Sequence, residues 1–344
     1  MLLYIHIPFC DSKCGYCGFN SFTNMLDFKE QYLSSLEIDL AKSLQNIKKL
    51  DSIYIGGGTP NTLNANDFER LFKLLESKIE CFSEITIELN PNVCESNILM
   101  EFKNLGINRF SIGVQSFRED KLKLLERNHS KKLAINFIEN ALKCDIDTSI
   151  DLIYDTILDS ASSLKEELEM ASLLGIGHIS CYALSIDKNS RFYIKNKNPT
   201  LDNSLCYELK ETLEKLNFNQ YEVSNYAKTH KSKHNLGYWQ YQDYIGVGLG
   251  AVGKINQNRF YKESNFKAYL KNPTNCRIER LESNDIVLEK IFLGARSEVG
   301  IERNIVKSPK LQDLLDSKIC VVKDNRIFSL NYFLADEITL WLNK

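Results

Sequence analysis

The chain has 344 residues, 43% of them hydrophobic, which allows one large and one smaller globular domain and excludes disordered and fibrous classes. Its 43 Lys and Arg against 45 Asp and Glu residues give a net charge of −2, so nucleic acid is not an expected partner. The N-terminal apolar run has no basic leader and is interrupted by His6 and Pro8, which argues against a signal peptide or membrane span. We therefore expect a cytoplasmic protein.

Six short apolar or alternating runs predict β-strands, at residues 2–7, 52–56, 84–89, 109–114, 148–153 and 178–184. Helical patterns lie between and after them, at residues 32–47, 68–75, 97–105, 131–143, 162–174 and 204–216. This alternation predicts an α/β fold in which parallel strands are joined by crossover helices, as a partial (β/α)6 barrel. A doubly wound sheet is the alternative. In both arrangements ligands bind at the carboxyl ends of the strands.

The pattern changes after about residue 226, which predicts a second domain. An aromatic and glycine-rich stretch at residues 234–254 precedes predicted helices at 264–270 and 285–296. Runs at residues 319–322 and 326–330 flank a turn at Asp324 and Asn325, which predicts a hairpin before a final helix. We therefore expect a core barrel at residues 1–225 and a smaller α+β domain, helical and winged-helix-like, at residues 226–344. A winged-helix shape does not by itself imply DNA binding.

Three of the ten cysteines are clustered in the loop after the first predicted strand, where Cys10, Cys14 and Cys17 form a C-x3-C-x2-C pattern. In a reducing compartment clustered thiols indicate metal binding or catalysis rather than disulfides. Zinc would need a fourth Cys or His ligand from a distant segment, whereas an iron–sulfur cubane held by three cysteines keeps one iron open. We interpret the scattered cysteines as small buried hydrophobic residues; they are Cys81, Cys94, Cys144, Cys181, Cys206, Cys276 and Cys320.

Glycines and polar residues follow or close several later strands, where a ligand is expected. Taken singly, a glycine run indicates a tight turn and a polar side chain indicates a solvated surface. Their coincidence at the ends of several strands instead predicts one shared binding site. These residues are Gly57, Gly58, Thr59, Glu88, Gln115, Arg127 and Asp151.

The run from Tyr4 through Cys10-x3-Cys14-Gly-Tyr16-Cys17 resembles the radical S-adenosylmethionine superfamily, and within it the oxygen-independent coproporphyrinogen oxidase branch. The resemblance covers nearly the whole chain. It implies a [4Fe-4S] cluster on the three cysteines, with S-adenosylmethionine chelated by the fourth iron and cleaved by an electron to a 5′-deoxyadenosyl radical.

The residues that close the later strands match the cofactor-binding pattern of this family in order. The resemblance implies that Arg127 pairs with the methionine carboxylate, while Glu88, Gln115 and Asp151 bind ribose hydroxyls or the ammonium group. The backbone of the glycine run from Gly57 to Thr59 approaches the methionine ammonium. Three further residues match apolar positions, where ordinary core packing is the alternative: Tyr4 and Tyr16 at the cluster or cofactor, and Ala183 at the adenine.

One loop departs from the family pattern. After Tyr154 the branch has a Gly-Leu-Pro turn, whereas this chain has Asp155-Thr156-Ile157. Because the permissive glycine and the rigid proline are both missing, we expect a loop of different shape.

Features of the branch separate an oxidase from a heme chaperone. The oxidases carry another cysteine where this chain has Phe19, and a long segment before the cluster loop, whereas nine residues precede Cys10 here. The run from His234 matches the H-N-x-x-Y-W signature of the heme chaperones and implies heme contact by His234, Asn235, Tyr238 and Trp239, with a packed domain junction as the alternative.

We therefore expect a heme chaperone that binds a [4Fe-4S] cluster, S-adenosylmethionine and heme, and delivers heme to respiratory proteins. An electron donor is a further expected partner, and peripheral contact with a membrane is left open. We expect the radical cofactor chemistry to be retained, but not coproporphyrinogen oxidase activity in porphyrin biosynthesis. There are two alternatives. One is coproporphyrinogen oxidase activity, and the other is radical chemistry on a different substrate.

Overall fold

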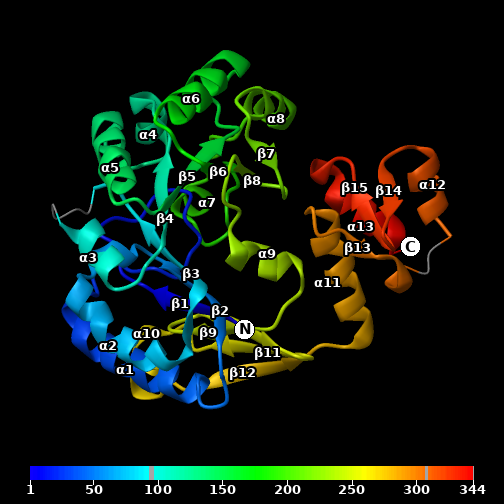
Figure 1. The fold of residues 1–344 in the computed structure, drawn as a ribbon. Coiled ribbons are helices and arrows are strands. Elements are labelled where there is room, and N and C mark those ends of the chain that lie inside the picture. Colours follow the sequence, from blue (N-terminus) through cyan, green and yellow to red (C-terminus); the bar gives the residue numbers. More distant parts are fainter. Residues whose placement is uncertain (93–96, 307–308, 344) are drawn as a thin grey trace.

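The protein is described here by a computed structural model that covers residues 1–92, 97–306 and 309–343 (Figure 1). Its main element is a 12-stranded sheet with the order β12-β11-β10-β9-β1-β2-β3-β4-β5-β6-β8-β7. The six central strands are parallel, as predicted: β1 (Leu2–Ile7), β2 (Leu50–Gly57), β3 (Ile79–Leu89), β4 (Arg109–Gln115), β5 (Asp147–Tyr154) and β6 (His178–Ala183).

Most of the helices lie between these strands in the chain and cover the outer face of the curved sheet (Figure 1), whereas the last two, α7 and α8, follow β6. Their apolar sides pack on the strands, as in α2, where Phe68, Leu71 and Leu75 are buried while the opposite side is exposed. The helices are α1 (Lys29–Ser43), α2 (Ala65–Leu75), α3 (Ile98–Asn104), α4 (Glu119–Leu124), α5 (Lys131–Lys143), α6 (Ala161–Leu173), α7 (Arg191–Ile194) and α8 (Cys206–Lys215). The partial barrel with six parallel strands is therefore confirmed.

The large sheet continues past the predicted domain boundary. After β7 (Asn219–Gln220), β8 (Asn225–Ala227) and α9 (Lys233–Trp239), strand β9 (Tyr244–Val247) pairs in parallel with β1. The strands β10 (Val252–Ile255), β11 (Asn258–Lys262) and β12 (Cys276–Arg280) follow antiparallel, with α10 (Phe266–Lys271) between the last two. A boundary between residues 225 and 226 thus falls within one hydrogen-bonded sheet.

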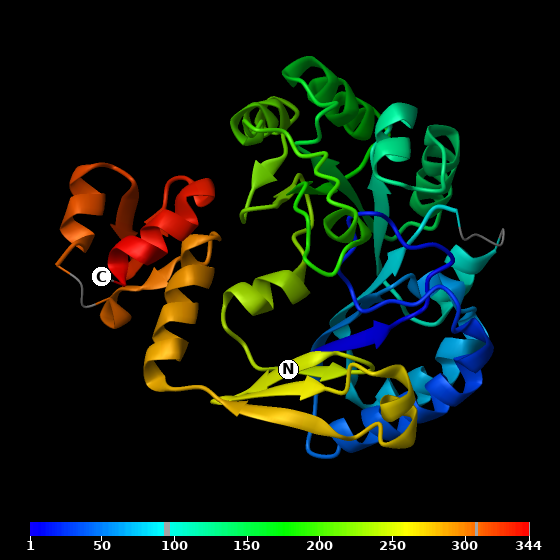
Figure 2. The same cartoon turned by 180° about the vertical axis from the view of Figure 1, so that it is seen from behind.

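A smaller α+β unit lies beside the barrel, reached through α11 (Ser283–Ala295), which Figures 1 and 2 show leading away from the edge strand β12. It has a hydrophobic core of its own, which includes Ile291, Ile327 and Ile338. Its sheet has the order β13-β15-β14. The elements are β13 (Ile301–Glu302), α12 (Leu311–Asp316), β14 (Cys320–Lys323), β15 (Arg326–Ser329) and α13 (Ala335–Leu342). We propose that this unit begins at α11 rather than at residue 226.

The scattered cysteines differ in exposure. Cys144, Cys181 and Cys320 are buried, and Cys206 and Cys276 are half-buried. Cys81 is exposed, so its expected burial is wrong; it precedes Glu84, where β3 regains its pairing with β2 after a register shift. Cys94 lies outside the described residues. Across the described part of the chain, no helix is both long and apolar enough to cross a bilayer.

Candidate functional site

A cavity of about 500 Å³ lies at the carboxyl ends of the central strands, and we call it the rim cavity. It brings together residues from β2 to β6 and from the cysteine loop, which are distant in sequence but meet at one edge of the parallel sheet. Of the residues predicted for the cluster and for S-adenosylmethionine, it includes Cys10, Cys14, Tyr16, Cys17, Gly57, Gly58, Thr59, Glu88, Gln115, Arg127, Asp151 and Ala183.

The cysteine loop forms one wall of the rim cavity. Its base is closed by two backbone hydrogen bonds, from Cys10 to the Phe22 carbonyl and from Phe22 to the Pro8 carbonyl. The Thr59 hydroxyl donates to Sγ of Cys10 over 3.5 Å. Burial raises the pKa of the Cys10 thiol, so ligation must supply the free energy that deprotonates it.

The glycine run after β2 permits the close approach of this loop. A Cβ on Gly58 would lie 2.5 Å from the Phe9 carbonyl oxygen and 3.0 Å from Sγ of Cys10. Gly57 has a φ of +118°, a conformation that favours glycine. The glycines therefore fit the backbone to the cysteine loop, in addition to any role in ligand binding.

The donor set of the loop is three thiols, soft ligands that suit an iron–sulfur cluster. Among the described residues, no three His, Cys, Asp or Glu side chains surround one point closely enough to hold a single metal ion. The chemistry of these three thiols fits the cluster that the resemblance implies.

Arg127 joins the cysteine loop to the strand ends. Its Nη1 donates to Sγ of Cys14 over 3.2 Å, and its Nη2 donates to Oδ1 of Asn90 and to the Gly113 carbonyl over 3.0 and 2.8 Å. Its Nε is buried and has no hydrogen-bond partner. Arg127 lines the rim cavity as a buried cation, which suits a ligand carboxylate, as expected for the methionine part of the cofactor.

Glu88 and Asp151 place two buried carboxyl groups in the same cavity. Glu88 accepts hydrogen bonds from the Gly57 backbone N–H over 3.0 Å and from the Tyr54 hydroxyl over 2.9 Å. Burial raises the pKa of Glu88 to about 7, opposed by the Gly57 hydrogen bond and reinforced by the charge of Asp151. Burial also raises the pKa of Asp151, although the hydroxyl groups of Ser111 and Ser180 counteract it. A bound cation would favour the ionised form of both groups, so this pair suits an ammonium or sulfonium ligand.

Gln115 reaches the rim cavity through an irregularity at the end of β4. The pairing of β4 with β5 shifts register between Gly113 and Gln115, and Gln115 has a φ of +66°. Residues in such conformations are held by the surrounding structure. The next two residues, Ser116 and Phe117, both donate hydrogen bonds to Oε1 of Glu167 on α6.

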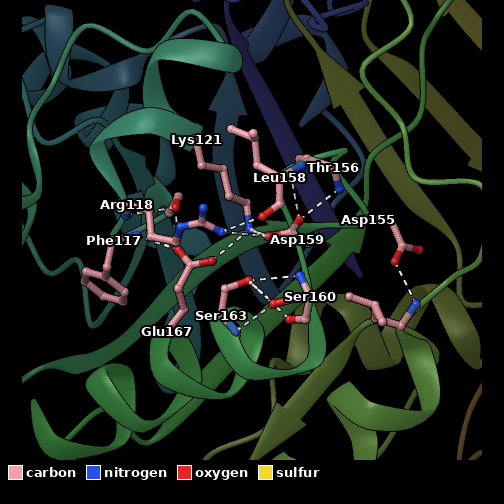
Figure 3. Close-up of polar contacts among 12 residues, drawn as sticks. Phe117, Arg118, Lys121, Asp155, Thr156, Leu158, Asp159, Ser160, Ser163 and Glu167 are labelled. Atoms are coloured by element: carbon pink, nitrogen blue, oxygen red, sulfur yellow. Dashed lines mark hydrogen bonds and ion pairs between the residues drawn. The ribbon is translucent and has the colours of Figure 1, made fainter.

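Figure 3 shows the buried ionic network that contains Glu167. Lys121 Nζ lies 2.8 Å from both Asp159 and Glu167, and the three side chains are at most 4% exposed. Asp159 also accepts hydrogen bonds from the backbone and hydroxyl groups of Thr156. The network therefore ties the loop that directly follows Gln115 at the end of β4 to the loop after β5.

The loop that departs from the family turn keeps a left-handed residue at its first position. Asp155 has a φ of +61°, a conformation that Asp tolerates better than most residues. Its carboxylate accepts hydrogen bonds from the Ser204 hydroxyl over 2.6 Å and from the Leu205 backbone over 2.8 Å. Asp155 thus supplies a positive φ and adds a link to the segment before α8.

Tyr4 lies outside the lining of the rim cavity. Its ring stacks on Tyr54 with the centroids 6.3 Å apart, and its hydroxyl is hydrogen-bonded to Nδ1 of His6 over 3.0 Å. Both tyrosines line a second cavity of about 720 Å³, which we call the tyrosine cavity. Tyr54 lines both cavities.

The residues of the H-N-x-x-Y-W signature lie on α9. His234, Asn235 and Tyr238 line the tyrosine cavity, whereas Trp239 lines neither cavity. His234 is 1% exposed; its Nδ1 is hydrogen-bonded to the Ser52 hydroxyl over 2.8 Å and its Nε2 to the Tyr238 hydroxyl over 2.9 Å. Burial lowers the pKa of His234 to about 3, so the ring is neutral. Ligation of iron by His234 would require one of these hydrogen bonds to break.

Among the lining residues of the rim cavity that sequence reasoning missed are Asn90 and Tyr54. Asn90 directly follows β3, where its side chain accepts from Arg127 and its backbone N–H donates to Asn61. Tyr54 is two residues before Gly56 on β2, so strand alternation places it on the face that approaches the ligand. The position of Asn90 directly after β3, and that of Tyr54 on the same strand face as Gly56, were the signals in the sequence that could have identified these two residues.

Comparison with known proteins places this geometry in a family. Residues 4–160 match the radical SAM superfamily. The heme chaperone HemW of Buchnera aphidicola subsp. Schizaphis graminum is 39% identical over 264 residues, covering 74% of this chain and 70% of the relative. The heme chaperone HemW of Haemophilus influenzae is 37% identical over 290 residues, covering 78% and 75%.

A solved structure shares the fold over the whole chain. Coproporphyrinogen III oxidase of Escherichia coli, described as a radical SAM enzyme, is similar with a TM-score of 0.84 at 21% identity, covering 100% of this chain and 90% of the oxidase. At this identity the likeness shows the fold alone. The chain therefore belongs to the radical SAM superfamily and, within it, to the HemW family.

Proposed function

We propose that the protein is a cytoplasmic heme chaperone that holds a [4Fe-4S] cluster and S-adenosylmethionine in the rim cavity and delivers heme to respiratory proteins. The observation that carries the proposal is the convergence of three thiols, a buried arginine and two buried carboxyl groups on one cavity. The names of the relatives support the heme function. An electron donor is a further partner in this proposal, and nucleic acid is not.

In this proposal each part of the rim cavity has a role. Cys10, Cys14 and Cys17 hold the cluster, which with S-adenosylmethionine supplies reductive cleavage of a sulfonium. Arg127 binds the methionine carboxylate, and the Glu88 and Asp151 carboxylates stabilise the positive charge or bind ribose. Gln115 adds an amide for the ribose, and Tyr16 and Ala183 add apolar surface.

Replacing Arg127 with glutamine should weaken S-adenosylmethionine binding by roughly 1.5 to 3 kcal/mol, the scale of a hydrogen bond to a charged group. Anaerobic calorimetric titration of the reconstituted protein measures this change, with iron and sulfide content determined on the same sample. Arg280→Gln on the exposed edge strand β12 is the control and should bind like the unaltered protein. Equal affinity in Arg127→Gln with an intact cluster would remove Arg127 from the cofactor site.

The chaperone and oxidase functions differ in a direct assay. We expect no conversion of coproporphyrinogen III to protoporphyrinogen IX when cluster, cofactor and reductant are supplied anaerobically. Phe19, at the position of the extra cysteine of the oxidases, is 68% exposed, so this wall of the rim cavity is open to solvent. Radical chemistry on a tetracarboxylate needs a sealed site. Protoporphyrinogen IX at catalytic turnover would favour the oxidase.

Heme delivery is tested by loading the protein with heme and adding a heme-free respiratory cytochrome. The expected result is the cytochrome spectrum, formed faster than from the same concentration of free heme. A cytochrome that takes up heme no faster from the loaded protein, or not at all, would contradict a role in delivery.

A further inference from the structure

The segment that follows β6 has a local excess of positive charge. Residues 188–201 contain four cations and no carboxylate, although the chain as a whole has a net charge of −2. The cations are Lys188, Arg191, Lys195 and Lys197, and we call residues 188–197, which include α7, the basic segment. Lys188, Arg191 and Lys195 are exposed, and Lys197 is half-buried. The basic segment therefore presents its charge to solvent.

The basic segment packs directly on the cysteine loop. The Phe192 backbone N–H donates to the Gly15 carbonyl over 2.8 Å, and Nη2 of Arg191 donates to the Lys13 carbonyl over 2.8 Å. A Cβ on Gly15 would lie 1.8 Å from the Phe192 ring, so the two segments are in close contact next to Cys14. A protein bound to the basic segment would therefore lie beside the proposed cluster ligands.

A neighbouring carboxylate offsets only part of this charge. Glu126 forms an ion pair with Arg191 and lies 3.5 Å from Lys197. Among the residues that the structure describes, no ion pair involves Lys188 or Lys195. These two ammonium groups are therefore available to a partner.

The cysteine loop adds a cation of its own. Lys13 lies between Cys10 and Cys14, and its Nζ donates to the carbonyls of Phe19 and Ser21 over 3.1 and 3.4 Å. The carboxylates of the loop and of the basic segment's surroundings are Asp11, Glu126 and Asp187. Five cations are therefore present against three carboxylates, and the surface around the cysteine loop is positive.

Two large apolar side chains are exposed within the basic segment. Tyr193 is 54% exposed and Ile194 is 74% exposed. Protein interfaces combine an apolar centre with a polar rim, and electron-transfer complexes are among the smallest, below about 1,200 Å² of buried surface. A short segment with this composition suits a small protein interface, since a free anion would not cover the two apolar side chains.

We infer that the basic segment and Lys13 form the docking surface for the electron donor, and that this donor is an acidic one-electron carrier protein. The inference rests on the proposed function and gives one of its partners a place and a charge. The donor loses one electron at this surface, and the cluster held by the three thiols gains it, so no further reactant is needed. Opposite charges speed the encounter of two such proteins, and salt weakens the effect.

An anionic membrane is the other surface that exposed cations could meet. Proteins that lie on a membrane commonly use a long amphipathic helix, whereas α7 (Arg191–Ile194) has four residues. The contact of α7 with the cysteine loop also has no purpose in membrane binding. The observations therefore favour a protein partner.

The test is stopped-flow mixing of a reduced plant-type [2Fe-2S] ferredoxin, an acidic carrier, with the reconstituted full-length protein and S-adenosylmethionine. The ferredoxin absorption reports its oxidation. The double variant Lys188→Glu/Lys195→Glu should lower the second-order rate constant at least tenfold at low ionic strength, and this difference should shrink at about 1 M salt. The control is Lys42→Glu/Lys48→Glu, which makes the same change in net charge at exposed positions before β2. It should react like the unaltered protein.

Iron content and the extent of cluster reduction by excess dithionite, measured on each variant, show whether the cluster is intact. Equal rate constants in Lys188→Glu/Lys195→Glu and the control would overturn the docking surface and leave the proposed function standing. The same holds if the double variant loses only its binding to phosphatidylserine vesicles, which would assign the cations to a membrane. A native protein that holds no cluster, or whose cluster dithionite does not reduce, would overturn the proposed function itself.

Discussion

Replacing Cys14 with alanine is expected to abolish most of the cluster absorption after anaerobic reconstitution. Cys14 is 9% exposed and lines the rim cavity with Cys10 and Cys17. Loss of one of three thiolates leaves two iron positions of the cubane open, and nothing in the cysteine loop offers a replacement thiol. The variant also frees Nη1 of Arg127, which donates to Sγ of Cys14.

Iron and sulfide analysis with visible absorption measures this effect. Cys276→Ala is a matched control, because Cys276 is half-buried on β12 outside the rim cavity, and it should keep the full cluster. Four irons and four sulfides per chain in Cys14→Ala would contradict the assignment of the ligands. Stoichiometric zinc and no iron in the native protein would contradict it as well.

Replacing Lys121 with methionine is expected to lower the free energy of unfolding by about 3 to 5 kcal/mol, the usual cost of breaking a buried ion pair. The substitution would remove the Lys121 ammonium, which contacts the buried carboxylates of both Asp159 and Glu167 (Figure 3). The guanidinium of Arg118, 3.7 Å from Asp159, would remain beside one of them. Glu167 accepts hydrogen bonds from Ser116 and Phe117, so the loop that directly follows Gln115 should loosen, and S-adenosylmethionine binding should weaken in parallel.

Denaturant unfolding followed by circular dichroism measures the loss. Lys165→Met on α6 is the control, because its ion pair with Glu169 is exposed and contributes about 1 kcal/mol at most. A loss in Lys121→Met no larger than that of the control would show that the network does not stabilise the fold.

The sequence was sufficient to predict the six central strands and most of the residues proposed for the cluster and cofactor that line the rim cavity. Strands such as β1 and β5 have apolar runs of clear period, and the carboxyl ends of parallel strands share one edge. It was therefore predictable that Glu88 and Asp151, 63 residues apart, would meet. The cysteine spacing likewise predicted the three thiols that line this cavity, which are the proposed cluster ligands.

The remaining features of the fold and the site depend on contacts between distant residues, which a local sequence pattern does not predict. The pairing of β9 with β1 joins residues more than 200 positions apart, so the aromatic stretch from residue 234 reads as a new domain. The His234 ring has both nitrogens occupied because Ser52 comes from β2, which no motif indicates. Lys121 and Glu167 look like surface charges on amphipathic helices, and only the fold shows that they face each other.

Protein contacts hold the signature histidine beside the tyrosine cavity. His234 fixes Tyr238 and supports Tyr54, and both rings line the cavity.

The proposed function requires one chain to hold heme and the cluster at the same time. Its most direct test is anaerobic titration of the fully reconstituted protein with heme, followed by absorption, with iron and sulfide counted at the end point. We predict saturation at one heme per chain with the cluster fully retained. Absence of saturable heme binding, or loss of the cluster as heme binds, would contradict the claim.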